Sequence, residues 1–316
     1  MTLVATRYQD DDFAMDYTAV AAVTAGDVVQ LPDGRAGIAS NDIAAGDKGA
    51  VATKGLFKVT KTASIVLLDG GRVYFDHSAE TATYAPANDH DFYLGTVSGD
   101  AAASDSTVTV NLNESPAAVI DLHTSGFEHV PVLTSGTPSL AMVGGTARAA
   151  FSATAEAQKL DLLSKRSVPV DANWILDAVV EVSTNADADV ADLNIGVANA
   201  THASDADSIT ESCFFHLDMG ADLNLDAESD DGTTEVAATD TTVNWAVGTP
   251  LYLTIDGRDE TNIKMYVNGV LVLDGTTFAL TAASGPIKAL VHLEKSANDS
   301  PGVVEVDHLQ LRIAEQ

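Results

Sequence analysis

The stretch Ile263-Lys264-Met265-Tyr266-Val267-Asn268-Gly269-Val270-Leu271-Val272 decides the fold class of this chain. Two apolar runs flank the Asn-Gly pair, and a type I′ turn needs positive φ at both of its central residues, which Asn and Gly tolerate best. The stretch therefore predicts a β-hairpin with a two-residue turn.

The same pattern of strand and turn signals extends over the rest of the chain, where short β-branched segments recur between Gly, Asp, Asn and Pro. Apolar and polar residues alternate over 251–255 and over 308–313, so each run is expected to bury one face only. Residues 153–164 are rich in helix-forming Ala, Glu, Gln, Lys and Leu, which leaves a helix open, but we expect a pair of strands there. The chain is predicted to be all-β.

Composition excludes some partners. With 46 acidic and 16 basic residues the formal net charge is −30, a field that repels phosphate groups, so we expect no nucleic-acid partner. The charge is uneven, at −8 for residues 1–113 and −22 for residues 114–316, and the second part is expected to face solvent. The acidic excess over 9 lysines indicates a marine or halophilic habitat.

Neither a disulfide nor a membrane segment is expected. Cys213 is the only cysteine, and its neighbours Phe214 and Phe215 predict a buried thiol in a strand. The sequence has no secretory leader pattern and no apolar run of about 18 residues. We therefore expect a soluble protein that is made in the host cytoplasm and has no membrane partner.

Turn-forming residues and changes in composition along the chain predict four segments. Residues 1–16 form an N-terminal arm, and residues 17–113 form a first β domain with Gly-containing turns at 24–27, 32–34, 45–47 and 69–71. Residues 114–144, rich in Ser, Pro, Thr and Gly, are expected to be a connector. Residues 145–316 form a larger β unit.

The first domain carries an ordered series of motifs: Val23-Thr24-Ala25-Gly26-Asp27-Val28-Val29, Ala36-Gly37-Ile38-Ala39, Ala44-Ala45-Gly46-Asp47, Ala50-Val51-Ala52-Thr53-Lys54-Gly55-Leu56-Phe57, Gly71-Arg72-Val73-Tyr74-Phe75-Asp76, Gly95-Thr96-Val97 and Val108-Thr109-Val110-Asn111-Leu112-Asn113. Their order and spacing resemble those of the small capsid cement proteins of tailed phages. The resemblance implies a compact, β-barrel-like domain that binds the outside of a viral capsid, commonly as a trimer.

The second unit is similar to concanavalin-like, laminin-G-like β-sandwiches with jelly-roll topology. The residues that carry this likeness are Pro250-Leu251-Tyr252-Leu253-Thr254-Ile255, Tyr266-Val267-Asn268-Gly269-Val270 and Val306-Asp307-His308-Leu309. Such domains are often appended to viral and surface proteins, so the resemblance implies an outward-projecting module.

Together the two resemblances imply a structural virion protein and no enzyme. The expected partners are the major capsid protein, two further copies of this chain and, as an alternative role of the sandwich, host surface glycans. The expected location is the outer capsid surface. In the arm, acidic and aromatic side chains could contact the capsid, although a frayed acidic tail is the alternative. These capsid-interaction candidates are Tyr8, Asp10, Asp11, Asp12, Phe13 and Tyr17.

Catalytic, metal and sugar sites have weaker signals. Glu305-Val306-Asp307-His308-Leu309-Gln310 is close to the Glu-x-Asp-x-x-Glu motif of sandwich glycosidases, but Gln310 replaces the last carboxylate and leaves the reaction without its acid. His216 and Asp218 would share a strand face and could bind a cation, although no third ligand is evident. No cofactor is expected.

Acidic loops leave calcium open as an occupant, because their oxygens are ligands that it prefers, but none has the spacing of an EF-hand. The candidate metal ligands in these loops are Asp187, Asp189, Asp205 and Asp207. Trp174 and Trp245 could stack on a sugar ring, but we expect both to pack in or at the edge of the core.

Overall fold

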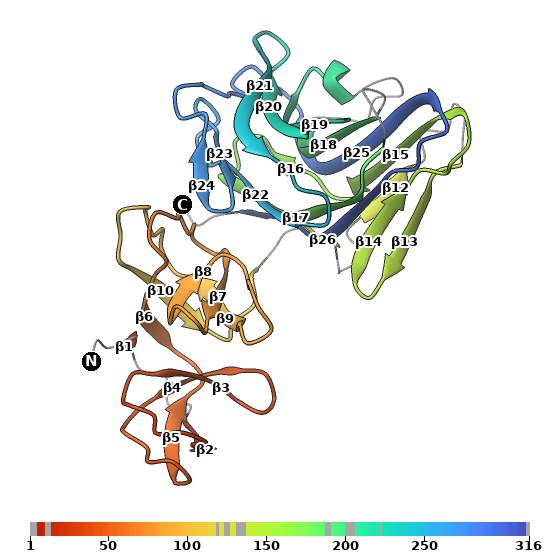
Figure 1. Ribbon diagram of the computed structural model, residues 1–316. Helices are drawn as coiled ribbons and strands as arrows, with labels where there is room; N and C mark the ends of the chain where they lie inside the picture. The colour runs from red at the N-terminus through yellow and green to blue at the C-terminus, as the bar shows by residue number, and fades with distance from the viewer. Residues whose placement is uncertain are drawn as a thin grey trace. The chain divides into compact units, whose positions relative to one another are not determined.

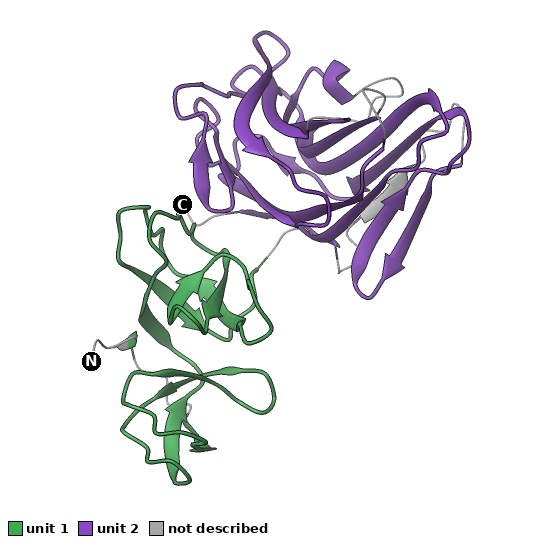
Figure 2. Cartoon of the chain, in the orientation of Figure 1, with its two compact units in different colours: residues 1–117 green, residues 118–316 purple. Residues whose placement is uncertain are grey.

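The computed structural model describes residues 5–9, 14–117, 120–122, 127–130, 137–186, 191–199, 206–220 and 223–313 (Figure 1). It divides into two compact units, residues 1–117 and residues 118–316 (Figure 2). Within the described ranges every regular element is a β-strand apart from the short 3-10 helix η2 (Ala206–Ser208). The all-β prediction is confirmed. Among the described residues, no helix has the length and apolarity needed to cross a membrane.

Unit 1 contains a six-stranded antiparallel sheet that curls toward closure. Its last strand returns to the second, because Lys61, next to β6, forms a parallel bridge with Ala82 in β8. A buried apolar cluster that includes Phe57 and Leu94 lies within the unit. The barrel-like prediction is confirmed for this sheet, whose order is β1 (Ala5–Gln9), β6 (Leu56–Thr60), β10 (Thr107–Leu112), β9 (Phe92–Val97), β7 (Arg72–Asp76) and β8 (Thr81–Thr83).

A smaller sheet of four strands completes unit 1. Its Gly-Asp turns form as the sequence indicates: Gly26 and Gly46 have φ of 92° and 85°, which a side chain would oppose. Asp27 also caps its own turn, since its carboxylate accepts a hydrogen bond from the Thr24 amide at 2.7 Å. The strand order of this sheet is β2 (Ala14–Thr18), β5 (Lys48–Ala52), β4 (Ala36–Ala39) and β3 (Val28–Gln30).

Gly95 shows why one motif position must lack a side chain. Its φ is 151°, and a Cβ there would lie 2.1 Å from the carbonyl oxygen of Asn111 in the neighbouring strand β10. Backbone atoms cannot move away without breaking the sheet, so only glycine fits.

Unit 2 is a sandwich of two eight-stranded sheets. The first, called here the β17 sheet, has the order β13 (Ser139–Val143), β14 (Thr146–Ala150), β26 (Val303–Ile313), β17 (Trp174–Thr184), β22 (Leu251–Gly257), β23 (Lys264–Val267) and β24 (Val270–Val272), with β11 (Ile120–Asp121) also paired to β26. The second, called here the β18 sheet, has the order β12 (Phe127–Val130), β15 (Glu156–Ser164), β25 (Pro286–Asn298), β18 (Ala191–Ala198), β19 (Ser212–Met219), β20 (Asn224–Asp230) and β21 (Glu235–Asn244), with β16 (Val168–Pro169) also paired to β25.

One continuous apolar core fills the sandwich. Leu176 and Leu253 enter it from the β17 sheet, and Leu193 and Leu217 enter it from the β18 sheet. The β-sandwich prediction for the second unit is confirmed by this two-sheet core. The hairpin prediction is confirmed as well, since Asn268 and Gly269 have φ of 53° and 73° between paired β23 and β24.

Three expectations are corrected. Residues 114–144 are no simple connector, because β11, β12 and β13 add strands to the sandwich sheets, although the division between the units falls in this segment. Residues 1–16 are no free arm where they are described, because β1 pairs with β6 and β2 pairs with β5. Within 153–164 the structure has the single strand β15, which is a strand as expected but no strand pair.

The polar side of β26 is also buried, against the expectation of one solvated face. His308, Gln310 and Arg312 are 6%, 2% and 3% exposed. Gln310 donates to Asp121 in β11, and Arg312 forms an ion pair with Asp177 at 2.8 Å. Partners on neighbouring strands therefore make burial of these polar groups tolerable.

Candidate functional site

Polar side chains form two rows across the outer face of the β18 sheet, the face opposite the core. Leu193, Leu217 and Leu293 face the core, so by strand alternation the residues on either side of them face outward. The strand register places these residues in two rows: Asp161, His292, Asn194, His216 and Asp226 in one, and Lys159, Glu294, Asp192 and Asp218 in the other.

His216 is the centre of this face. Its ring is 6% exposed, Nδ1 lies 3.2 Å from Asp207 Oδ1 and 3.8 Å from Glu228 Oε1, and Nε2 lies 3.1 Å from Asp218 Oδ1. Burial disfavours the charged ring, but the bonds to Asp207 and Glu228 outweigh it and raise the pKa of His216 to about 12. The ring is therefore an imidazolium held among carboxylates at neutral pH.

The carboxylates around His216 outnumber the cations. Burial, together with a hydrogen bond to Asp218 and the charge of that residue, raises the pKa of Asp192 to about 7. Burial likewise raises the pKa of Glu228, while the bond to His216 lowers it. Among the described residues of this face, two groups have the composition and spacing to hold a metal ion, and both include His216: Asp192, His216 and Asp218, and Asp207, His216 and Glu228.

A second histidine network lies beside the first. His292 is 1% exposed, with Nδ1 2.5 Å from Asp161 Oδ1 and Nε2 3.1 Å from Glu294 Oε2. Burial opposes its charge, but the bonds to the two carboxylates raise its pKa to about 9. Lys159 completes the network with an ion pair to Glu294 at 2.5 Å.

The metal candidates from the acidic loops have different outcomes. Asp187, Asp189 and Asp205 lie outside the described residues. Asp207, in η2, is brought to His216, so the third ligand that the His216-x-Asp218 pattern lacked comes from a separate segment. The sequence signal was the alternation of polar residues in β18, β19 and β25, but only the cross-strand register brings them together.

The two tryptophans pack in the core, as expected, and do not take the alternative role of stacking on a sugar. Trp174 is 0% exposed and Trp245 is 4% exposed, and both belong to the sandwich core. Each indole Nε1 donates to a backbone carbonyl four residues away, Val170 O at 3.0 Å and Thr249 O at 2.9 Å. Their aromatic faces are therefore not presented to a ligand.

The polar residues of the glycosidase-like motif in β26 each contact a different partner. Glu305 lies 3.4 Å from Arg148 Nε, and Asp307 accepts a hydrogen bond from the Thr146 hydroxyl at 3.2 Å. Gln310, which replaces the third carboxylate, is bound to Asp121.

Two of the capsid-interaction candidates lie in edge strands of unit 1. Tyr8 lies in β1 and Tyr17 in β2. Tyr17 is half-buried against the small apolar cluster of the four-stranded sheet, so its ring is partly used within the unit. The candidates Asp10, Asp11, Asp12 and Phe13 lie outside the described residues.

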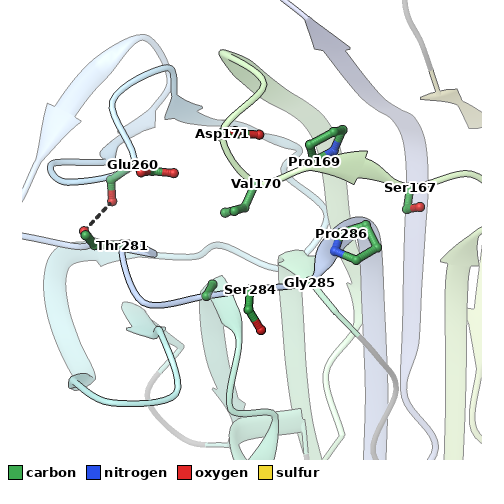
Figure 3. Close-up of a pocket in the computed structure, with 10 residues that line it drawn as sticks. Ser167, Pro169, Val170, Asp171, Glu260, Thr281, Ser284, Gly285 and Pro286 are labelled. Atoms are coloured by element: carbon green, nitrogen blue, oxygen red, sulfur yellow. Dashed lines mark hydrogen bonds between the residues drawn. The ribbon is translucent and has the colours of Figure 1, made fainter.

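A cavity of about 670 Å³ lies at one end of the sandwich. Figure 3 shows Glu260 and Thr281 on one side and Pro169 and Pro286 on the other, with Asp171 and Val170 between them. The Thr281 hydroxyl donates to the Glu260 carbonyl at 3.5 Å. Hydroxyl and carboxylate groups line much of the cavity, which suits a polar ligand.

The fold and these sites define a two-unit β protein: a small barrel-like unit followed by a β-sandwich with a polar outer face. Residues 8–112, nearly all of unit 1, match the model of a family described as phage cement protein. The resemblance indicated by the Gly-Asp motifs is thereby confirmed for the first third of the chain. A search of curated proteins finds no match to the sequence.

Among solved structures, the chain is similar to an endo-acting O-glycanase that members of the human gut microbiota express in mucin breakdown, with TM-score 0.46, 8% identity and coverage of 63% of this chain and 100% of the other. It is also similar to the carbohydrate recognition domain of Emp47p, with TM-score 0.44, 13% identity and coverage of 63% and 95%. The carbohydrate-binding module CBM66 from Bacillus subtilis gives TM-score 0.37, 10% identity and coverage of 59% and 95%. At these scores the likenesses support no inference about binding or catalysis.

Proposed function

We propose that this protein is a structural component of a tailed-phage virion that binds the outer surface of the capsid and stabilises it. The observation that supports the proposal is the coincidence of the cement-family match, residues 8–112, with unit 1, residues 1–117. The similarity thus covers a whole folding unit with its own apolar cores. Unit 1 is the docking module, and the sandwich projects outward.

Stabilisation would follow from linkage. A protein that binds only the assembled shell stabilises that shell by RT ln(1 + [L]/Kd) for each site. Attachment as a trimer would raise the effective concentration of each docking module and slow dissociation. A native mass three times that of the 32.7 kDa chain is the result expected from sedimentation or light scattering.

The four-stranded sheet of unit 1 offers apolar anchors for this docking. Val20 is 93% exposed and Met15 is 37% exposed, and both lie at or beside β2. Exposed apolar side chains within an acidic surface are typical of contact sites, because their burial against a partner is favourable. We therefore place the capsid contact on the β2 side of unit 1.

The proposal is tested by mixing the full chain with undecorated, expanded capsids and measuring uptake by sedimentation. The wild-type chain should bind with fixed stoichiometry and raise the temperature of capsid rupture. Val20→Asp should bind at least 10-fold more weakly, because docking would bury the added charge without a partner. Val143→Asp, at a 57% exposed residue of the sandwich strand β13, is the matched control and should bind like wild type. Absence of uptake would refute the proposal.

A second function, weak binding of host surface glycans, is favoured by the cavity beside β16 and β25. Its volume of about 670 Å³ and its hydroxyl and carboxylate groups suit a sugar. On a glycan array, binding that Asp171→Ala and Ser284→Ala both reduce would support this role. Silence of the wild-type chain on the array would oppose it.

We propose no catalytic role for the sandwich. The dispersed contacts of Glu305, Asp307 and Gln310 support this, because a glycosidase needs two carboxyl groups that face one sugar. Hydrolysis of a polysaccharide that disappears in Glu305→Gln would contradict it.

A further inference from the structure

The strongest unassigned feature of the sandwich is a four-sided polar cluster on the outer face of the β18 sheet. Its members come from four separate elements: Asn194 from β18, His216 from β19, Glu228 from β20 and Asp207 from η2. Asn194 Nδ2 lies 2.7 Å from Asp207 Oδ1, 3.1 Å from Glu228 Oε1 and 3.0 Å from His216 Nδ1. His216 Nδ1 lies 3.2 Å from Asp207 Oδ1 and 3.8 Å from Glu228 Oε1.

These separations fit the coordination shell of a small divalent ion. Four ligands at about 2.0–2.1 Å from a tetrahedral zinc ion lie about 3.3 Å from one another. Five of the six separations within the cluster run from 2.7 to 3.8 Å, three of them measured to Asn194 Nδ2, and the ligand atoms of Asp207, His216 and Glu228 all lie within 4.8 Å of one another. Small shifts of the side chains would therefore create the shell once the Asn194 oxygen takes the place of Nδ2. We propose that this cluster binds one Zn²⁺-like divalent cation through His216 Nδ1, the carboxylates of Asp207 and Glu228, and the Asn194 amide oxygen.

An independent observation at Asn194 points to the same ligand. This side chain is 1% exposed; its Nδ2 is directed into the cluster, whereas its Oδ1 has no hydrogen-bond partner among the described residues. A buried amide oxygen without a partner is costly, and such groups call for an explanation. A half-turn of the amide would give up the contacts of Nδ2 with Asp207, His216 and Glu228 and would place Oδ1 among the three other ligand atoms, where a cation would replace those contacts.

The surroundings of His216 support coordination through Nδ1. Its Nε2 faces Asp218 Oδ1 at 3.1 Å, the carboxylate–histidine arrangement that keeps a proton on the outer nitrogen. Metal binding would displace the Nδ1 proton of the imidazolium to solvent and leave that nitrogen as the ligand. The side chain of Asp207 is 38% exposed, so the cluster is reachable from solvent on that side. One nitrogen and three oxygens suit zinc better than calcium, which takes six to eight oxygens at about 2.3–2.6 Å.

The ion would act as a structural cross-link. It would tie η2 to three neighbouring strands in a chain whose one cysteine excludes an intrachain disulfide. Because the folded cluster is the binding site, occupancy should raise the unfolding temperature of the sandwich. This proposal is independent of capsid docking, which is assigned to unit 1.

The test is isothermal titration of the chelator-treated full chain with Zn²⁺, Mn²⁺ and Ca²⁺. One Zn²⁺ per chain should bind, more tightly than the other two ions. Asp207→Asn, a change at a partly exposed side chain, should weaken Zn²⁺ binding more than 100-fold. Asp218→Asn should weaken it by the roughly 10–100-fold that loss of an outer-shell partner costs.

Asp226→Asn is the matched control, since it removes the same charge opposite His216 without removing a ligand. It should change Zn²⁺ affinity less than 3-fold, and circular dichroism should show that every variant is folded. Three results would overturn the proposal: no stoichiometric Zn²⁺ binding by the wild-type chain; equal losses in Asp226→Asn and Asp207→Asn, which would indicate only a diffuse acidic field; or a loss in Asp218→Asn with none in Asp207→Asn, which would place the ion on the other side of His216.

Discussion

As the pH rises through the mildly alkaline range, the free energy of unfolding of the sandwich is expected to fall. Replacing His292 with Gln should halve this fall per pH unit. His292 is 1% exposed between Asp161 and Glu294. Burial opposes its charge, but the two hydrogen bonds raise its pKa from 6.5 to about 9. A raised histidine pKa gives stability that is fully present below about pH 6.5 and is lost as the pH rises through the folded value of about 9.

The magnitude follows from the number of protons. Between about pH 7.5 and 8.5 the unfolded chain has released the His292 proton and the folded chain retains it. The free energy of unfolding therefore falls by about 1.4 kcal/mol per pH unit. His216, whose pKa is raised to about 12, contributes a second proton of the same sign. The free energy of unfolding should therefore fall by about 2.7 kcal/mol per pH unit in the wild-type chain and by about 1.4 in His292→Gln. Asp192, with a pKa of about 7, is mostly ionised in this range and adds little.

Urea unfolding followed by tryptophan fluorescence measures this directly, because both tryptophans, Trp174 and Trp245, lie in the sandwich. The titrations are made with a chelator present, so that no metal competes for His216. His77→Gln, a change in unit 1, is the matched control and should leave the slope unchanged. A wild-type stability that is independent of pH in this range, or an equal slope in His292→Gln, would show that His292 does not hold its proton in the folded chain.

Three further changes test the packing. Gly95→Ala should destabilise unit 1 by at least the roughly 1–3 kcal/mol typical of overpacking, since its Cβ would lie 2.1 Å from Asn111 O; calorimetry of unit 1 unfolding measures this, and an unchanged transition would contradict the β9–β10 register. Gly196→Ala should lower the urea midpoint of the sandwich by a similar energy, because its Cβ would lie 2.0 Å from Cys213 O, and a wild-type midpoint would show that β18 and β19 pair differently. The Cys213 thiol is 0% exposed and burial raises its pKa, so a thiol reagent should modify it only after unfolding; rapid modification of the native chain would place it at the surface.

Local signals predicted the features that depend on neighbouring residues. The Asn268-Gly269 turn and the Gly26 and Gly46 turns each need positive φ, a property that the residue type itself reveals. The burial of Cys213 followed from its two phenylalanine neighbours. The connector prediction for residues 114–144 was wrong because it was based on their Ser, Pro and Gly content. In the structure β11 and β12 form by pairing with β26 and β15, which come later in the chain.

The His216 cluster was only half predictable for the same reason. The period-two spacing of His216 and Asp218 gave a shared face, but Asn194 and Glu228 join them through strand register, which sequence spacing does not determine. Asp207 arrives from η2, outside the sheet. The polar side of β26 was expected to face solvent, because alternation of apolar and polar residues distinguishes two faces of a strand. It does not reveal that Asp121 and Asp177 bind Gln310 and Arg312 on the polar face and allow its burial.

Unit 1 is proposed to bind the viral shell while the sandwich faces outward. Electron cryomicroscopy of undecorated capsids saturated with the full chain tests it most directly. We expect density of the size of unit 1 in contact with neighbouring capsomers, with the sandwich beyond it. Capsids that stay bare, or density in which the sandwich alone contacts the shell, would contradict it.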